Sequence, residues 1–377
     1  MNILLRNARV LFAEQPGSDL FVIDGRIQYH RTQSGMTSSG DGLFVLPGLV
    51  DAHAHLISSP LLGVAGYTEA RSADPEELAR RVLAHLTAQR SGGVLAVRDC
   101  GDSSGTVIAL MRTFDSSMPH LQAAGQFIAA PGRYMPNVAH EVIGGDIVSA
   151  AKMEAARGGG WVKFIGDSSH RDHPEADADV GWTLDELRPA VAAARNAGAR
   201  IAMHVTTSAA VEMAIALDID SIEHGSHLKP EHLRQMGERG RAWTPTLAAF
   251  RIFLRRIRSG ELKMPERSFA EAVEAIERQL PLAAAAGVTL LCGTDGAIEH
   301  GKIGFEVLAF IDAGLTPERA LRAVTIDSWK YLGLGNPLEE NAAADFVAYD
   351  RDPFSDPEVL LSPSLVVRNG QVVSGRL

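Results

Sequence analysis

The sequence predicts an α/β protein whose main part is a (β/α)8 barrel. Two observations carry this prediction. From residue 47 to residue 339, short apolar runs alternate with helical segments, which is the pattern of a parallel β-sheet. Several of these runs end in a histidine, a lysine or an aspartate, and the catalytic groups of such barrels lie at the C-terminal ends of the strands. At 377 residues the chain is long enough for one large domain or two smaller ones.

Eight apolar runs supply the strands of this barrel. The first contains Leu49 and Val50, just before His53 and His55. On an extended backbone the two imidazoles point to the same side and form half of a metal site. Without further context they are equally compatible with two unrelated strand histidines. The other seven strands are expected at residues 94–98, 121–129, 161–165, 200–204, 221–223, 242–246 and 288–292.

Helix start signals lie between these strands. Asp74 suits an N-cap and Pro75 the first helical position, and this helix is expected to run to Gln89. Thr183 and Glu186 form a capping box that begins another helix. Further helices are expected at residues 266–286, with a kink at Pro281, and at residues 316–332.

The two ends of the chain, residues 1–46 and 340–377, do not continue the alternation of strands and helices. Both contain turn signals that are typical of hairpins, Asp24-Gly25 in the first and an Asn-Gly pair in the second. Strand-like pieces lie at residues 3–12, 21–28, 344–349 and 364–373.

The composition indicates which partners and compartment to expect. The formal charge of -10 argues against nucleic acid or an anionic membrane as partner, because both select basic surfaces. Only Cys100 and Cys292 occur, which is too few for a disulfide framework or a thiolate metal site and favours a reducing compartment. The N-terminus lacks a signal-peptide pattern, and no apolar run reaches the length of a membrane span. We therefore expect a cytoplasmic protein.

Residues able to bind metal stand at the ends of five of the predicted strands. Imidazole and carboxylate ligands suit zinc and similar divalent ions, and the lack of cysteine ligands indicates an open catalytic site. Each residue has an alternative reading taken alone: a solvated lysine, a core histidine or a helix-capping aspartate. The ordered set is His53, His55, Lys163, His204, His224 and Asp295.

With this set, nearly the whole chain resembles the amidohydrolase superfamily of metal-dependent hydrolases. The opening at residues 47–55 and the run at residues 222–225 are most similar to its prolidase-like and imidazolonepropionase-like branch. The resemblance implies the two-metal subtype, in which the lysine is carboxylated by carbon dioxide. It also implies that the chain ends, residues 1–46 and 340–377, pair into a small β-sandwich beside a barrel of residues 47–339.

The resemblance assigns a role to each ligand. His53, His55 and Asp295 would hold one ion, His204 and His224 the other, and carboxylated Lys163 would join them. A hydroxide bridging two zinc ions would attack the substrate, and Asp295 would pass its proton to the leaving group. One-metal members of the superfamily carry a glutamate where this sequence has Thr207, which argues against a cytosine- or guanine-type deaminase.

Loops after the strands are expected to bind the substrate. Loop 130–140 places Arg133, Tyr134 and His140 close to the predicted site; the arginine suits a substrate carboxylate and the histidine a scissile carbonyl. An exposed arginine and a structural histidine are the alternatives. The polar stretch 166–180 is either a mobile lid, with His170 and His173 as a metal pair, or a solvated loop. The apolar residues Phe250, Phe253 and Leu254 suit either a substrate pocket or a helix core.

The sequence thus predicts a binuclear, Xaa-Pro dipeptidase-like hydrolase that cleaves an amide bond in a dipeptide or an N-acyl amino acid. A lactone, carbamate or organophosphate ester hydrolase is the alternative with the same metals. A non-catalytic barrel is the alternative from another class, and a missing ligand would be its sign. Related barrels often associate, so a homo-oligomer is compatible with the sequence, although no stretch identifies an interface.

Overall fold

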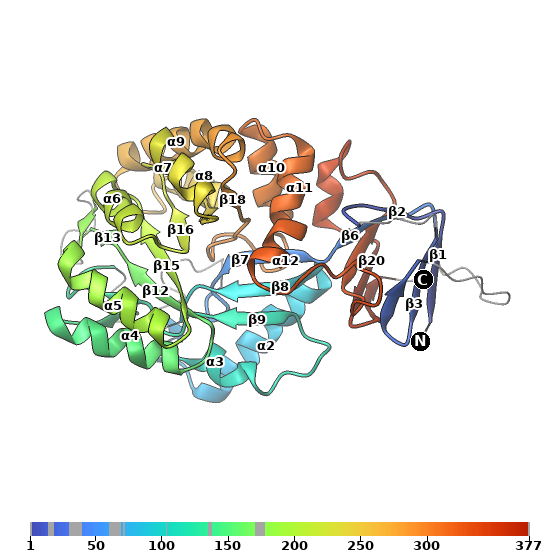
Figure 1. Cartoon of the computed structure of the whole chain (residues 1–377), viewed down its shortest axis with the longest axis horizontal. Coiled ribbons are helices and arrows are strands. Elements are labelled where there is room, and N and C mark those ends of the chain that lie inside the picture. Colours follow the sequence, from blue (N-terminus) through green and yellow to red (C-terminus); the bar gives the residue numbers. More distant parts are fainter. Residues whose placement is uncertain are drawn as a thin grey trace.

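The computed structural model describes residues 2–13, 19–29, 40–59, 69–70, 72–102, 104–134, 138–169 and 178–375. It is a mixed α/β fold in which the strands lie inside and the helices outside (Figure 1). His170 and His173, with most of the candidate lid at 166–180, lie outside the described residues.

The interior strands form two parallel sheets. One has the order β7-β8-β9, and in the other β10-β12-β15-β16-β17-β18 follow one another in chain order, with β11 on the edge beside β10. These strands are β7 (Leu49–Ala54), β8 (Val94–Asp99), β9 (His120–Ala123), β10 (Ile128–Ala129), β11 (His140–Glu141), β12 (Trp161–Ile165), β15 (Arg200–Val205), β16 (Ser221–His224), β17 (Ala242–Thr244) and β18 (Thr289–Leu290).

The prediction of one continuous third strand at residues 121–129 is wrong. It is divided into β9 and β10, and Gly125 between them adopts a left-handed φ of 69°. The carbonyl of Gly125 accepts a hydrogen bond from the backbone N–H of Asp102 (2.8 Å), and the next N–H, that of Gln126, donates to the carboxylate of Glu154 (3.1 Å). These side bonds replace ladder bonds, so the strand is interrupted here.

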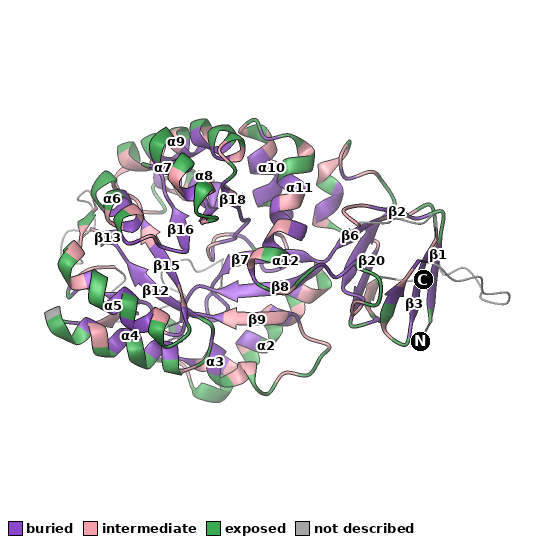
Figure 2. Cartoon of the chain, viewed as in Figure 1, coloured by how far each residue is buried: buried purple, intermediate pink, exposed green. Residues whose placement is uncertain are grey.

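The outer helices bury one side against the strands and expose the other (Figure 2). Asp74 caps α2 through the N–H of Glu76 (2.9 Å), and both bonds of the Thr183–Glu186 capping box are present, as predicted. Residues 316–332 form two helices rather than one, because Thr325 leaves the helical region at φ −128° and ψ −111°. The helices are α2 (Pro75–Ser91), α3 (Thr106–Met111), α4 (Ile147–Ala156), α5 (Leu184–Asn196), α6 (Ser208–Ala216), α7 (Pro230–Glu238), α8 (Leu247–Arg258), α9 (Glu266–Ala285), α10 (Gly304–Asp312), α11 (Pro317–Val324) and α12 (Ile326–Tyr331).

The chain ends meet in two further sheets, at the right of Figure 1. In the larger one, β6 from the N-terminal part pairs antiparallel with β19 from the C-terminal part, and side chains from both parts share a buried apolar cluster. Asp24-Gly25 and Asn369-Gly370 form tight turns with positive φ at both positions, as the turn signals predict. The strands are β1 (Ile3–Arg6), β3 (Leu20–Ile23), β4 (Arg26–Gln28) and β5 (Gly40–Asp41) in one sheet, and β2 (Arg9–Val10), β6 (Phe44–Pro47), β19 (Phe346–Tyr349), β20 (Leu365–Arg368) and β21 (Gln371–Gly375) in the other.

Within the described ranges, none of the helices combines the length and the apolar character that crossing a membrane requires.

Candidate metal centre

The six predicted ligands come together at one end of the interior strands. The imidazole centroids of His53 and His55 are 5.3 Å apart, those of His53 and His224 are 5.2 Å apart, and those of His204 and His224 are 4.6 Å apart. Lys163, on β12 between the two histidine pairs, is buried and lies close enough for its charge to act on His53, His204 and His224. The strand ends therefore assemble one compact donor cluster.

Three donor atoms have the spacing of a metal site. Oδ1 of Asp295 lies 3.2 Å from Nε2 of His53 and 3.5 Å from Nε2 of His55. Zinc bonds of about 2.0–2.2 Å at tetrahedral angles would hold donor atoms about 3.4 Å apart. His53, His55 and Asp295 thus fit a divalent ion without rearrangement.

Hydrogen bonds on the far side of each imidazole fix which nitrogen faces this site. His53 donates from Nδ1 to the carboxylate of Glu223 (2.7 Å), and His55 donates from Nδ1 to the carbonyl of Gly101 (2.9 Å). The neutral form of each ring therefore has Nε2 unprotonated, which is the form that binds metal. Burial opposes a charge on His53, but the anionic groups around it, with Asp295 and Glu223 among them, raise its pKa well above 6.5, so an ion bound there would displace a proton.

Glu223 is a candidate positioning residue that the sequence alone did not indicate. Its carboxylate accepts from Nη2 of Arg98 (2.9 and 3.0 Å) and from the hydroxyl of Ser221 (2.6 Å), and the guanidinium of Arg98 lies over the ring of Trp161. Burial alone would raise the pKa of Glu223, but the charges on Arg98 and His53 hold it well below its usual range. Glu223 therefore remains ionised and orients His53 from behind.

The second donor group consists of His204 and His224. Thr246 gives its only hydroxyl proton to the carbonyl of Pro245 (2.8 Å), so Nδ1 of His224 donates to the Thr246 oxygen (2.7 Å) and its Nε2 is unprotonated. Nδ1 of His204 is buried and has no hydrogen-bond partner in the described part of the chain. Burial lowers the pKa of His224 to about 3 and lowers the pKa of His204 well below its ordinary value, so both rings are neutral and able to bind metal.

Asp167, just after β12, supports His204. It lies on β13 (Asp167–Ser168), which forms a short hairpin with β14 (Asp179–Val180), and its Oδ1 is 3.7 Å from Nε2 of His204. The backbone and hydroxyl groups of Thr206 and Thr207 donate to its carboxylate at 2.6–3.0 Å. Thr207 thus anchors an aspartate instead of supplying a ligand.

Lys163, like Nδ1 of His204, differs from the other groups of this network. Its side chain is 2% exposed, yet no hydrogen bond or ion pair joins it to another described residue. A buried ammonium without a partner is costly. Among the described residues, the amine is therefore available for modification or metal binding.

A second group of candidate ligands, His53, Cys100 and Glu223, has donor atoms within 4.8 Å of one another. In this group the nitrogen of His53 and the carboxylate of Glu223 already share a hydrogen bond. Since the bond occupies both groups, they support the first donor set and do not form a vacant site.

Tyr134 lies against the cluster, as the sequence analysis predicts for a substrate-binding residue. Its ring is 5.3 Å from those of His204 and Phe127. The residue has a left-handed φ of 63°, and its N–H donates to Oγ of Ser168 (3.0 Å). Burial and the charge on Asp295 raise the pKa of Tyr134, so its hydroxyl stays protonated. A strained backbone held by a hairpin is typical of a positioned functional residue.

Arg133 and His140 are placed differently. Arg133 donates from Nη1 to the carbonyl of Ser168 (2.9 Å), and its Nη2 is 3.7 Å from Asp179, so the arginine ties loop 130–140 to the β13–β14 hairpin. Nδ1 of His140 is 3.8 Å from the buried carboxylate of Glu154. Their side chains are 24% and 28% exposed. Within the described part of the chain, no hydrogen bond or ion pair joins either side chain to the six predicted ligands.

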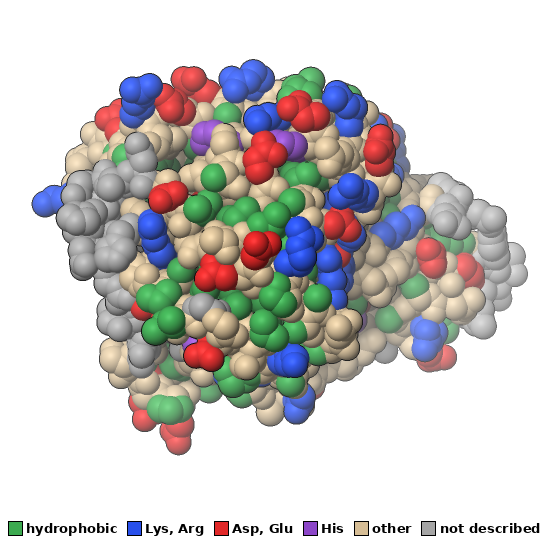
Figure 3. All heavy atoms as spheres, turned by 60° about the vertical axis from the view of Figure 1, so that its left-hand side comes forward, with side chains coloured by type: hydrophobic (Ala, Val, Ile, Leu, Met, Phe, Trp, Pro, Cys, Tyr) green, Lys and Arg blue, Asp and Glu red, His purple; other side chains and the backbone are tan. Residues whose placement is uncertain are grey.

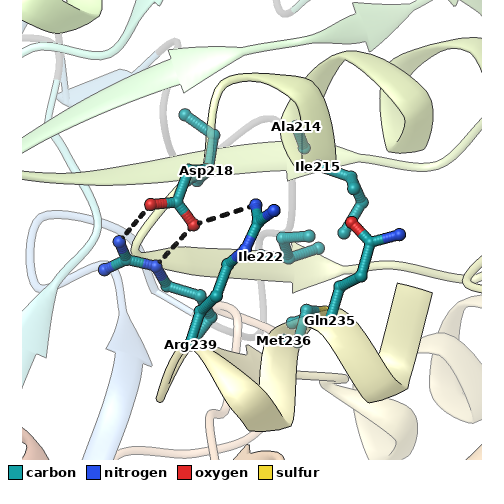
Figure 4. A pocket seen from close by; sticks show the side chains of 9 residues that line it. Ala214, Ile215, Asp218, Ile222, Gln235, Met236 and Arg239 are labelled. Carbon is teal, nitrogen blue, oxygen red and sulfur yellow. Dashed lines mark hydrogen bonds and ion pairs between the residues drawn. The ribbon is translucent and has the colours of Figure 1, made fainter. Parts of the chain in front are cut away.

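A small cavity lies between α6 and α7 and is also lined by Ile222 of β16 (Figure 4). Its volume is about 10 Å³, roughly one water molecule. Asp218 at its edge is held by Arg239 and Arg241. The cavity is too small for a substrate.

Replacing Glu223 by glutamine is expected to weaken metal binding about 10- to 100-fold, because the amide no longer accepts strongly from His53. The change also leaves the buried Arg98 without its counter-charge, which costs about 3–5 kcal/mol of unfolding free energy. Competition with a chelator and denaturant unfolding measure the two effects. Glu212→Gln, at a side chain that is 55% exposed, is the control; equal behaviour of the two variants would contradict the role of Glu223.

The buried carboxyl group of Glu306 predicts that the folding stability of the protein depends on pH. Its carboxylate accepts from the N–H groups of Leu247 (2.8 Å) and Ala248 (2.7 Å) and so fixes the first turn of α8, which follows Thr246. Burial raises the pKa of Glu306 from 4.5 to about 8. The folded chain then holds the proton more tightly than the unfolded chain, so the stability from Glu306 is complete below pH 4.5 and is lost as pH rises through about 8.

In thermal unfolding from pH 4.5 to 9, the wild type should therefore lose stability relative to Glu306→Gln, in which this position does not titrate. A difference in Tm that stays constant over this range would contradict the assignment.

Comparison with known proteins places the chain among amidohydrolases. The model of the "Amidohydrolase family" matches residues 44–373. An uncharacterized protein of Mycobacterium tuberculosis is 34% identical over 366 residues, which are 95% of this chain and 92% of that protein. Ochratoxinase of Aspergillus niger is 24% identical over 238 residues, which are 61% of this chain and 49% of that enzyme.

The fold is similar to that of solved structures. A crystal structure of a Xaa-Pro dipeptidase with bound methionine in its active site superposes with a TM-score of 0.82 at 22% identity, over 99% of each chain. The predicted resemblance to the amidohydrolases is confirmed: the chain belongs to the amidohydrolase family.

Proposed function

We propose that this protein is a binuclear metal-dependent amidohydrolase that cleaves the amide bond of a dipeptide or an N-acyl amino acid, in the manner of a Xaa-Pro dipeptidase. The observation that carries the proposal is the donor cluster at the strand ends. It contains four imidazoles, one carboxylate and one buried lysine that has no hydrogen bond or ion pair to another described residue. The similarity to ochratoxinase and to a Xaa-Pro dipeptidase supports a hydrolase of this kind.

The scaffold of the proposal is a closed eight-stranded barrel of residues 47–339, with residues 1–46 and 340–377 as a β-sandwich beside it. Two seams between the interior sheets support closure. At one seam, Ala52 donates to Cys292 and Asp295 donates to His53, both at 2.8 Å. At the other, Ala123 forms a parallel bridge with Gly160. Hydrogen bonds therefore cross both gaps between the sheets.

His53, His55 and Asp295 would hold one ion, expected to be zinc, and His204 and His224 would hold a second. Carboxylation by carbon dioxide would turn Lys163 into an anion able to join them and would remove the cost of its buried ammonium. When bound, the two ions would polarise the scissile carbonyl and bring the pKa of water close to neutrality.

Side chains of the protein would transfer the proton and bind the substrate. Asp295, whose second oxygen is turned toward His224 (Nδ1 at 3.9 Å), would take the proton of the attacking water and give it to the leaving amine. Tyr134, protonated and packed on His204, would donate a hydrogen bond to the substrate. Arg133 would bind the substrate carboxylate with the donors that Ser168 leaves free, and His140 would contact the scissile carbonyl.

The surroundings are compatible with a small-molecule substrate. On the face drawn in Figure 3, acidic and basic side chains are interspersed and do not form a field of one sign. Cys100 and Cys292 are both free and buried, which supports the proposal of a reducing, cytoplasmic setting.

The test is a substrate panel measured with purified enzyme. Dipeptides with C-terminal proline and N-acyl amino acids form one arm, and lactones, carbamates, aryl esters and organophosphate esters form the other. Preferential hydrolysis of the first arm supports the proposal, whereas preference for the second arm replaces it with the ester-type alternative. A His204→Ala variant with full activity and full metal content would refute the site itself.

A further inference from the structure

A row of aromatic rings extends from the ligand cluster toward the surface. The ring of Phe250 on α8 lies 5.3 Å from that of His224, Phe269 on α9 lies 5.6 Å from Phe250, and Phe253 lies 6.4 Å from Phe269. Phe250 is 6% exposed, whereas Phe253 and Phe269 are partly exposed. The row thus begins beside a predicted metal ligand and ends at partly exposed side chains.

The inner end of the row is fixed relative to His224. Thr246 accepts the hydrogen bond from His224 and directly precedes α8, whose first two N–H groups are held by Glu306. Phe250 follows one turn later, and its own N–H donates to the carbonyl of Thr246 (3.1 Å). The aromatic surface is therefore pre-positioned beside the ligands.

The charged side chain nearest to this row in the sequence is engaged elsewhere. Arg251, between Phe250 and Phe253 on α8, donates to Glu277 (2.7 Å) and Asp312 (3.1 Å). Among the described residues, the ring-to-ring contacts of the three phenylalanines are with one another and with His224, while Phe250 and Phe269 also pack against the hydrophobic core. An apolar group, which needs no counter-charge, is the chemistry that such a surface accepts.

The Tyr134 side of the cluster has the opposite character. Tyr134 packs on His204, and its neighbours in loop 130–140, Arg133 and His140, keep partly exposed polar side chains. Because Phe250 packs on His224, the two faces lie against different histidines of the pair. The site is asymmetric, with an aromatic face on one histidine and a polar face on the other.

We propose that the preferred substrate is an N-acyl amino acid whose acyl group is an arene or another large apolar group. The acyl group would lie along Phe250 and Phe269, and the amino-acid carboxylate would face Arg133. This assignment rests on the proposed function, since it requires hydrolysis of an amide between the two faces. It adds a preference for the size and polarity of the acyl group, which the metal ligands alone do not impose.

The test compares kcat/KM for N-(phenylacetyl)alanine and N-acetylalanine. The wild type is expected to favour the phenylacetyl compound about 10- to 100-fold. Phe269→Ala, at a partly exposed position, should reduce this ratio about tenfold without impairing folding, as checked by thermal unfolding. Phe305→Ala is the matched control: this phenylalanine on α10 is 47% exposed and is not part of the row.

Failure of this substrate rule can be distinguished from failure of the proposed function. Equal kcat/KM values for both compounds, or a ratio that Phe269→Ala leaves unchanged, would overturn the substrate rule while the proposed function stands. If neither compound is cleaved, the proposed function fails, and calorimetry then compares the binding of phenylacetate and acetate. Tighter binding of phenylacetate that Phe269→Ala abolishes supports the substrate rule. Equal binding of the two acids refutes it.

Discussion

Replacing Asp295 by asparagine is expected to lower kcat/KM for amide hydrolysis about 10^4-fold. The carboxylate faces Nε2 of both His53 and His55 at 3.2 and 3.5 Å, so its loss removes an anionic ligand and the proposed proton acceptor together. Burial alone would raise the pKa of Asp295, but the charge on His53 and the hydrogen bond from His53 hold it well below its usual range. The wild-type side chain is therefore anionic at neutral pH.

Steady-state kinetics and metal analysis of the same preparation measure this effect. Asp350→Asn, at an aspartate that is 72% exposed, is the matched control and should keep full activity. An Asp295→Asn enzyme within tenfold of the wild type would mean that another group accepts the proton.

Replacing Lys163 by methionine is expected to reduce the metal content from two ions to at most one per chain, with a loss of about 10^3-fold in kcat/KM. Methionine keeps the buried stem and removes only the amine, so packing between Trp161 and Ile165 is preserved. Folding stability should be unchanged or increased, because a buried cation without a described partner is removed.

Lys330→Met, on the exposed side of α12, controls for a general effect of removing a lysine. Labelling the wild type with 13C-bicarbonate adds a direct readout, since carboxylated Lys163 would give a carbamate signal that Lys163→Met lacks. A variant with two ions and normal kinetics would exclude a bridging lysine.

The sequence is informative about the predicted ligand cluster because each of its residues lies close to the C-terminal end of a strand. Parallel strands in one sheet bring their C-terminal ends to one edge, so order along the chain predicts proximity in space. The structure does bring His53, His204 and Asp295 into one cluster, although these residues are far apart in the sequence.

The residues behind the ligands could not be found in the same way. Glu223 and His224 are neighbours on one strand, and alternation would place them on opposite faces. His224 has a left-handed φ of 66°, which breaks the alternation and allows both to serve the site. For Asp167, the partners Thr206 and Thr207 lie about 40 residues away, and no local pattern links them.

Arg133 illustrates a different limit. A loop arginine near a predicted site suggests substrate binding, but the carbonyl of Ser168 that occupies part of its guanidinium lies 35 residues further along the chain. The interruption of the third strand at Gly125 has the same origin, since Asp102 and Glu154 bond there from other segments. Tertiary contacts, which local propensity does not include, decide both cases.

The most direct test of the two-metal site is metal analysis of protein purified without chelator, paired with hydrolysis before and after metal removal. The proposed site predicts about two zinc-like ions per chain, loss of amide hydrolysis when they are removed, and recovery when they are restored. One ion per chain in fully loaded, active protein would contradict it, because Lys163 would then not join two metals.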